Sequence, residues 1–192
     1  AAGAATFKYG AMRQWVEGIT VVLPCGDVLS IARGEISASD EGVIVIRTGA
    51  GDRTVVVPDL RMPDVPKRSA GYHAAPGMDV IDLFIGAEGT LGFVVEATMR
   101  LDRAPKNLTA MVLGTADFDS IMPVLHAFQG RLDLTAFEFF SDKALAKVMG
   151  RGDVPAPFET DCPFYALLEF EATTEEVANT ALETFEHCVE QG

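Results

Sequence analysis

Short stretches of alternating apolar and polar residues dominate the first half of the chain. One stretch spans residues 19–31 and is interrupted at Pro24–Asp27, where proline, glycine and aspartate favour a turn. This pattern predicts a β-hairpin. Two further strands are predicted at residues 43–46 and 54–57, because both are rich in β-branched residues and a glycine-containing turn separates them.

The clearest alternation begins at residue 93 and continues to residue 101. It predicts a strand with one buried face. The residues expected on that face are Phe93, Val95, Ala97, Met99 and Leu101. The preceding segment, residues 78–85, is too short for its periodicity to decide between helix and strand. Asp79 near its start favours a helix, because a carboxylate stabilises a helix N-terminus.

The spacing of apolar residues becomes helical after Ala104–Asn107, where proline and asparagine break the strand pattern. We place a domain boundary there. The predicted elements beyond it are a strand at 108–114, a helix from Phe118 to Phe128, a strand at 134–140, a short helix opened by Ser141, a strand at 164–170 and a helix beginning at Thr173. This order predicts an α+β fold, a ferredoxin-like β-α-β-β-α-β unit without its final strand.

The helices of this second region carry recognisable signals. Thr173 and Glu176 have the spacing of a capping box, in which each side chain bonds a backbone N–H of the first turn. We expect Leu145 and Val148 to point inward from the short helix. The expected apolar stripe of the last helix is Val177, Ala181, Phe185 and Cys188.

Composition narrows the function classes. The formal net charge of −13 argues against binding to nucleic acid or to anionic membrane surfaces, which select for lysine and arginine patches. No apolar run approaches the ~20 residues that span a bilayer, and no leader pattern is present, so we expect a soluble, cytoplasmic protein. The chain begins at Ala1 without a methionine, which indicates an excised fragment or a processed product.

Candidate catalytic and metal-ligating residues are few. Cys25, Cys162 and Cys188 are odd in number and widely spaced, and we interpret them as reduced thiols. His126 and His187 lie on separate predicted helices, and we expect neither to bind a metal. The sequence contains no zincin, nucleophile-elbow, Walker A or Gly-x-Gly-x-x-Gly motif. We therefore assign no metal site and no catalytic residue.

A glycine at every third position marks the segment Gly86–Gly92. Glycines at 86, 89 and 92 remove Cβ atoms and permit positive φ, so a ligand could approach the backbone N–H groups. A structural explanation is equally consistent with the spacing, since a helix that ends and turns into a strand also needs glycine.

The string Asp79–Leu101, read as a whole, resembles the signature of FAD-linked oxidases of the vanillyl-alcohol-oxidase type. It is most similar to the branch that contains glycolate oxidase, D-lactate dehydrogenase and D-2-hydroxyglutarate dehydrogenase. In that family this loop lies against FAD. The resemblance therefore implies cofactor contacts for Glu88, Gly89, Thr90, Leu91, Gly92, Phe93 and Val94.

Two other segments match the same family. Near the start, Ala2, Gly3, Tyr9, Gly10 and Arg13 match an element whose first part touches FAD, which implies cofactor contacts for Gly3, Tyr9 and Gly10. The asparagine and second glycine of that element are missing, and Ala4 replaces the latter. In the proline-rich segment 59–76, matching residues are Lys67, Gly71 and Tyr72.

The resemblance implies a domain arrangement and a reaction. Residues 1–104 correspond to the second half of a PCMH-type FAD-binding domain and residues 105–192 to part of the substrate cap. Leu134–Phe140 and Cys162–Glu169 resemble cap segments. The implied reaction is oxidation of a 2-hydroxy acid by hydride transfer to FAD, with oxygen, a quinone or an electron-transfer flavoprotein as electron acceptor. The family's catalytic base and metal ligands correspond to positions beyond Gly192.

Other readings remain open. For the chain by itself we favour a non-catalytic module over an active enzyme: a fragment, or one subunit of a split flavoprotein in which a homodimer mate or a partner chain supplies the rest of the FAD site. Within the family, a carbon–oxygen exchange like that of alkyl-dihydroxyacetone-phosphate synthase is a further alternative. Bound FAD would separate a competent flavoprotein from an inactive fragment.

Overall fold

The computed structural model describes residues 3–49, 51–58, 63–65 and 71–191. They form two compact units of mixed helix and strand. The first unit spans Gly10–Asp102, and the second combines Gly3–Tyr9 with the residues from Arg103 onward. No helix in the described ranges is long and apolar enough to cross a membrane.

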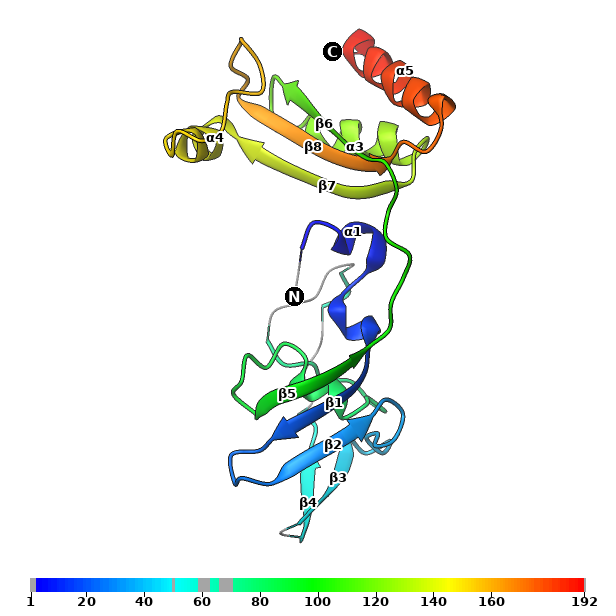
Figure 1. The fold of residues 1–192 in the computed structure, drawn as a ribbon, viewed down its shortest axis with the longest axis vertical. Coiled ribbons are helices and arrows are strands. Elements are labelled where there is room, and N and C mark those ends of the chain that lie inside the picture. The colour runs from blue at the N-terminus through cyan, green and yellow to red at the C-terminus, as the bar shows by residue number, and fades with distance from the viewer. Residues whose placement is uncertain (1–2, 50, 59–62, 66–70, 192) are drawn as a thin grey trace. The chain divides into compact units, whose positions relative to one another are not determined.

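The first unit contains two small antiparallel sheets, ordered β2-β1-β5 and β3-β4 (Figure 1). Its elements are the 3-10 helix η1 (Met12–Trp15), β1 (Val16–Val22), β2 (Val28–Ala32), β3 (Val43–Thr48), β4 (Gly51–Val56), α2 (Ile81–Phe84) and β5 (Phe93–Met99). The predicted hairpin is confirmed as β1–β2, with Ile19 opposite Ile31. The two strands predicted after it are confirmed as the antiparallel pair β3–β4.

The core of the first unit lies between these sheets and α2. Val21, Ile44, Val80 and Ile81 are completely buried and form its centre. The segment at residues 78–85, which the sequence left undecided, contains the single helical turn α2. Asp79 bonds the backbone N–H of Ile81 at 2.9 Å, as a residue at a helix start does.

The prediction of a buried face on β5 is wrong in this structure. Phe93 is 73% exposed and Val95 56% exposed, although the strand forms where predicted. β5 is the end strand of its sheet and pairs only with β1 among the described strands. Alternation determines which residues share a face, but a neighbouring layer is needed to bury that face.

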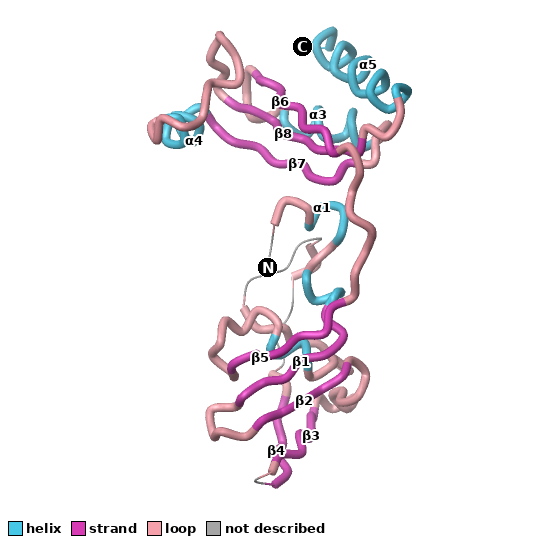
Figure 2. The backbone as a smooth tube through the Cα atoms, viewed as in Figure 1, coloured by secondary structure: helices cyan, strands magenta, loops and turns pink. Residues whose placement is uncertain are grey.

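The second unit contains the antiparallel sheet β6-β8-β7 together with the helices α3, α4 and α5 (Figure 2). Its elements are α1 (Thr6–Tyr9), β6 (Leu108–Thr115), α3 (Ile121–Gln129), β7 (Leu134–Ser141), α4 (Asp142–Met149), β8 (Phe164–Glu171) and α5 (Glu175–Gln191). Each strand and helix predicted here from periodicity is confirmed within a few residues.

Side chains from α3, α5 and one face of the sheet form the core of this unit. Phe128 and Leu168 are completely buried, and Ala181 contributes from α5. Ser141 caps α4 as predicted, because its hydroxyl accepts the Ala144 N–H at 3.3 Å.

Three details of the helix predictions are wrong. Val148 is 45% exposed, because α4 buries none of its residues. Phe185 is 39% exposed, whereas the polar Thr184 is buried. The hydroxyl that caps α5 belongs to Thr174, which accepts the Val177 N–H at 3.3 Å. The helix therefore starts one residue later than the capping-box spacing predicts.

Candidate functional site

The segment between α2 and β5 is a tightly curled loop. Gly86, Glu88 and Gly89 all have positive φ, at 86°, 51° and 78°. Glycine adopts this conformation at little steric cost, so it explains the residue type at positions 86 and 89. Glu88 adopts it against the usual preference of an L-residue, and such positions often mark functional segments. The loop therefore adopts, at Gly86 and Gly89, the positive φ that the sequence predicted.

Gly92 meets a different requirement, because it lies directly against β1. A Cβ at this position would come within 2.5 Å of the Val21 Cγ1 atom and 3.0 Å of the Val22 carbonyl oxygen. By contrast, a Cβ at Gly89 would have no atom within 4 Å. Glu88, Gly89 and Thr90 are exposed. The C-terminal end of the loop is thus fixed to the sheet while its tip presents backbone to the outside.

Two hydroxyl groups hold the tip in place. The Thr90 hydroxyl donates to the Ala87 carbonyl oxygen at 2.6 Å, and the Thr90 backbone N–H reaches the same oxygen at 3.0 Å. The Tyr72 hydroxyl lies 2.7 Å from the Thr90 Oγ1 atom. Since Thr90 uses its only hydroxyl proton on Ala87, Tyr72 is the donor to Thr90. The tip is therefore bonded to a separate segment of the first unit.

An apolar cavity of about 470 Å³ borders the same loop. Leu91 and Phe84 contribute to it from the loop and from α2, and Arg53, Tyr72 and His73 are its polar lining residues. The remaining lining residues are Leu23, Pro24, Cys25, Ile46, Val55, Pro58 and Leu83. Apolar walls with a few polar groups are typical of a site for a flat organic ligand.

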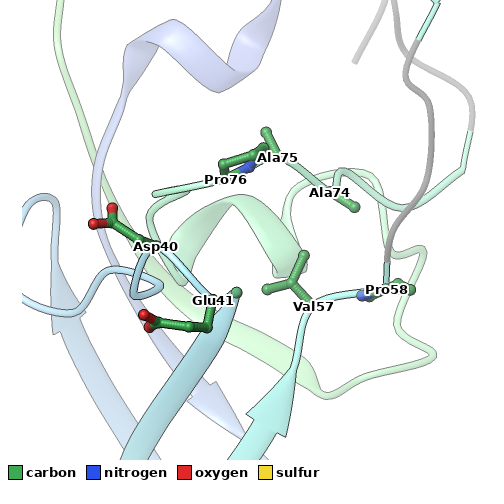
Figure 3. Close-up of a pocket in the computed structure, with 8 residues that line it drawn as sticks. Asp40, Glu41, Val57, Pro58, Ala74, Ala75 and Pro76 are labelled. Atoms are coloured by element: carbon green, nitrogen blue, oxygen red, sulfur yellow. The ribbon is translucent and has the colours of Figure 1, made fainter.

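A second hollow, of about 250 Å³, lies at the ends of β3 and β4 (Figure 3). Its walls are mainly apolar, and Asp40 and Glu41 are its charged lining residues. The other lining residues are Gly42, Val57, Pro58, Ala74, Ala75 and Pro76. A hydrogen bond from the Ser39 side chain lowers the pKa of Glu41. Its lining includes no thiol, imidazole or hydroxyl, so it is a weaker candidate than the glycine loop.

The predicted cofactor residues near the start of the chain divide between the two units. Gly10 belongs to the first unit and has a φ of 72°. Gly3 and Tyr9 belong to the second, where the Gly3 carbonyl oxygen accepts the Thr6 N–H at 3.0 Å at the start of α1. That these residues and the glycine loop hold one cofactor stays a prediction. The predicted Lys67 lies outside the described residues, as does Ala2.

Charged contacts connect α1 to the rest of the second unit. The Lys8 ammonium lies 2.8 Å from the Asp133 carboxylate and 3.3 Å from that of Glu171. The hydrogen bond to Asp133 is the main reason that the pKa of Lys8 is raised. The pKa of Glu171 is lowered, chiefly because the Lys106 backbone N–H donates to it at 2.9 Å. All four groups belong to the second unit.

Within the described ranges, no three histidine, cysteine, aspartate or glutamate side chains form a group that could hold a metal ion. His126 lies on α3 and His187 on α5.

Two residues outside the predicted cofactor site support this loop. Tyr72 matches a family element, and it bonds the loop tip. Arg13 matched the opening segment and donates to the carbonyl oxygens of Asp82 and Ile85 at the loop entry. No local pattern could have identified either contact, because the partners are 18 and 72 residues apart in sequence.

Comparison with known proteins finds a family match in the second unit and longer proteins that are similar to the whole chain. Residues 104–192 match the family described as "FAD linked oxidases, C-terminal domain". The match covers a little less than half of the chain. The family segment covers the described strands and helices of the second unit except α1.

The whole chain, including the loop of the first unit, is similar to several longer proteins. It is 60% identical over its full length to a D-2-hydroxyglutarate dehydrogenase of Stutzerimonas stutzeri and 36% identical to one of Xanthomonas citri. It is 28% identical over 95% of its length to a D-lactate dehydrogenase of Anaerostipes hadrus. It covers 34%, 33% and 32% of these proteins, or about a third of each.

Proposed function

We propose that this chain is part of an FAD-dependent oxidoreductase that acts on the CH–OH group of a 2-hydroxy acid. The observation that carries the proposal is the 60% identity, over all 192 residues, to a protein named D-2-hydroxyglutarate dehydrogenase. D-2-hydroxyglutarate is accordingly the first substrate to test. D-lactate follows, because another relative is named D-lactate dehydrogenase.

FAD is the cofactor in this proposal, and residues Glu88–Val94 contact it mainly through backbone groups. The structure offers a suitable surface. Gly89 has open space where a side chain would be, and the neighbouring Glu88 and Thr90 are exposed. A flat heteroaromatic ring can approach such backbone more closely than it can approach a segment with side chains. When bound, FAD supplies the acceptor for the hydride.

The chain's own residues position and shield the cofactor. Gly92 holds the loop end against β1, and the Tyr72–Thr90 hydrogen bond fixes the tip. In the same proposal, Gly3, Tyr9 and Gly10 add contacts from the opening segment. We assign no proton-transfer step to any residue of this chain.

We assign residues 1–104 to the second half of a PCMH-type FAD-binding domain and residues 105–192 to a substrate cap of ferredoxin-like topology. The strand order β6-β8-β7, with antiparallel neighbours, supports the cap assignment. So does the placement of α3 and α5 over one sheet face. This is the arrangement of the first three strands of a β-α-β-β-α-β unit.

A second candidate follows from the fraction of the relatives that the chain covers. Because it spans about a third of their length, we also consider a non-catalytic subunit, completed by a second copy or by a partner chain. The two candidates differ in one measurable property. A subunit of a split flavoprotein would gain flavin only in the presence of its partner.

The test is to purify the native full-length protein and measure flavin absorbance per polypeptide, then add D-2-hydroxyglutarate without oxygen. We expect bound FAD and bleaching of its visible band by the D enantiomer, with less bleaching by D-lactate, glycolate or L-2-hydroxyglutarate. A protein that remains colourless with added FAD would contradict the proposal.

Matched glycine variants test the role of the loop. Gly92→Ala places a methyl group against β1, so the loop must shift and flavin content should fall. Gly49→Ala is the control, because the nearest neighbour of its new Cβ, the Asp27 Oδ1 atom, would lie at an ordinary 3.9 Å. Equal flavin content in both variants would show that the loop is not part of the cofactor site.

A further inference from the structure

The first unit contains a buried carboxylate that the proposed chemistry does not use. Asp82 on α2 is 9% exposed and lies between two arginines. Its Oδ1 atom is 3.3 Å from the Arg13 Nη1 atom and 3.2 Å from the Arg33 Nη2 atom. We infer that Arg13 is a positioning residue, which sets the conformation of the Gly86–Gly92 loop through the end of α2 and thereby controls flavin retention. This inference rests on the proposed FAD function.

The contacts of Arg13 lead directly to the loop. Its Nη1 atom donates to the carbonyl oxygen of Asp82, and its Nη2 atom donates to the carbonyl oxygen of Ile85 at 2.9 Å. Ile85 immediately precedes Gly86, where φ turns positive. One guanidinium therefore binds the side chain of a helix residue and the two carbonyl groups that lead into the loop.

A helix as short as α2 needs this support. It is four residues long, and the last carbonyl groups of any helix have no N–H partner within the helix. The following Gly86 samples more backbone conformations than other residues, so an unanchored loop would lose more entropy on ordering. The planar guanidinium of arginine can bond several acceptors at once, whereas the lysine ammonium acts as a point charge.

Arg33 provides an internal comparison. It shares the Asp82 carboxylate, but its other bonds go elsewhere. Its Nε atom donates to the Val16 carbonyl oxygen at 2.6 Å, and its Nη2 atom donates to the Arg13 carbonyl oxygen at 3.0 Å. Arg33 therefore braces η1 and β1, and it donates to neither Asp82 O nor Ile85 O. Removal of either arginine breaks an ion pair with Asp82, but only removal of Arg13 releases the loop entry.

The experiment compares Arg13→Gln, Arg13→Lys and Arg33→Gln in the native full-length protein. Hydrogen–deuterium exchange of the peptides that cover residues 86–94 is measured without FAD, and FAD affinity is measured by quenching of flavin fluorescence. Thermal unfolding selects a temperature at which every variant is folded. Arg13→Lys retains a charge beside Asp82, so it serves if Arg13→Gln does not fold.

We expect Arg13→Gln to speed exchange in residues 86–94 and to weaken FAD binding about tenfold, the effect of losing two ordinary hydrogen bonds. Arg13→Lys should show a smaller change in the same direction. Arg33→Gln should lower thermal stability while loop exchange and FAD affinity stay near those of the wild type.

Each other outcome is decisive. Equal loop exchange in Arg13→Gln and Arg33→Gln would overturn the positioning role. Faster exchange with unchanged FAD affinity would overturn the link to flavin, while FAD binding by the wild type would still support the proposed function. If the wild type does not bind FAD, the proposed function and the flavin role of Arg13 both fail, and the exchange data alone decide whether Arg13 holds the loop.

Discussion

The strands β5 and β8 have similar sequence patterns but very different surroundings. Both belong to three-stranded antiparallel sheets, one in each unit. β8 is the central strand of its sheet, and its Leu168 is completely buried. β5 is an end strand, and its Val95 is 56% exposed. Position in the sheet and the layer above it, rather than local sequence, account for this difference.

The comparison shows what alternation can and cannot predict. A period of two residues places alternate side chains on one face of a strand. Whether that face is buried depends on residues distant in sequence. On β8 the cover comes from α3 and α5, which pack on the same core as Leu168. In the described part of the first unit, Phe93 and Val95 have no comparable cover.

The largest expected effect is the difference in stability between two alanine substitutions, one in β8 and one in β5. Leu168→Ala should destabilise the second unit of the 192-residue chain by about 2–5 kcal/mol, because it leaves a cavity in a packed core. Val95→Ala should change stability by less than about 0.5 kcal/mol, because the side chain is already largely hydrated. Urea unfolding followed by circular dichroism measures both.

The same pair of variants can be measured in a longer protein that contains this chain. A large cost of Val95→Ala there, but not in the 192-residue chain, would show that further polypeptide covers β5. A large cost in the 192-residue chain itself would contradict the exposed position of β5.

A smaller effect should appear when a change in pH breaks the charged contacts that Lys8 on α1 makes with the rest of the second unit. The pKa of Lys8 is raised above its ordinary 10.5, and that of Glu171 is lowered below its ordinary 4.5. The stabilisation is therefore complete between these two values. It is lost as the pH falls through the folded-state pKa of Glu171 or rises through that of Lys8.

Calorimetry of the wild type and of Lys8→Met tests this expectation. The difference in melting temperature of the second unit should be greatest near pH 7 and should shrink at both extremes. A difference that does not vary with pH would show that Lys8 contributes through packing alone.

The smallest effect concerns the thiols and does not involve stability. Cys25 in the first unit is exposed, whereas Cys188 on α5 is partly buried and burial raises its pKa. Because the thiolate is the reactive form, iodoacetamide at neutral pH should modify Cys25 several-fold faster than Cys188. Peptide mass spectrometry over time measures both rates, and unfolding in urea should make them similar. Equal rates in the folded protein would contradict the burial of Cys188.

The backbone conformation of the candidate loop could be predicted from the sequence, but the contacts that hold the loop in place could not. The spacing of Gly86 and Gly89 indicated positive φ, and both residues have it. The reason for Gly92 could not be read from the sequence, because it is the proximity of Val21 on another strand. The bonds of Tyr72 and Arg13 to the loop depend in the same way on chain segments that only folding brings together.

By itself, the sequence determined the positions of the strands and main helices, the turn of the β1–β2 hairpin and the glycine loop, because these depend on residues within a few positions of one another. Only the tertiary structure decided which faces are buried and how the loop is held. Phe93 is exposed and Asp82 is buried between two arginines, although neighbouring residues predict neither. The physical reason is that burial and ion pairing depend on distances in space, which local periodicity does not determine.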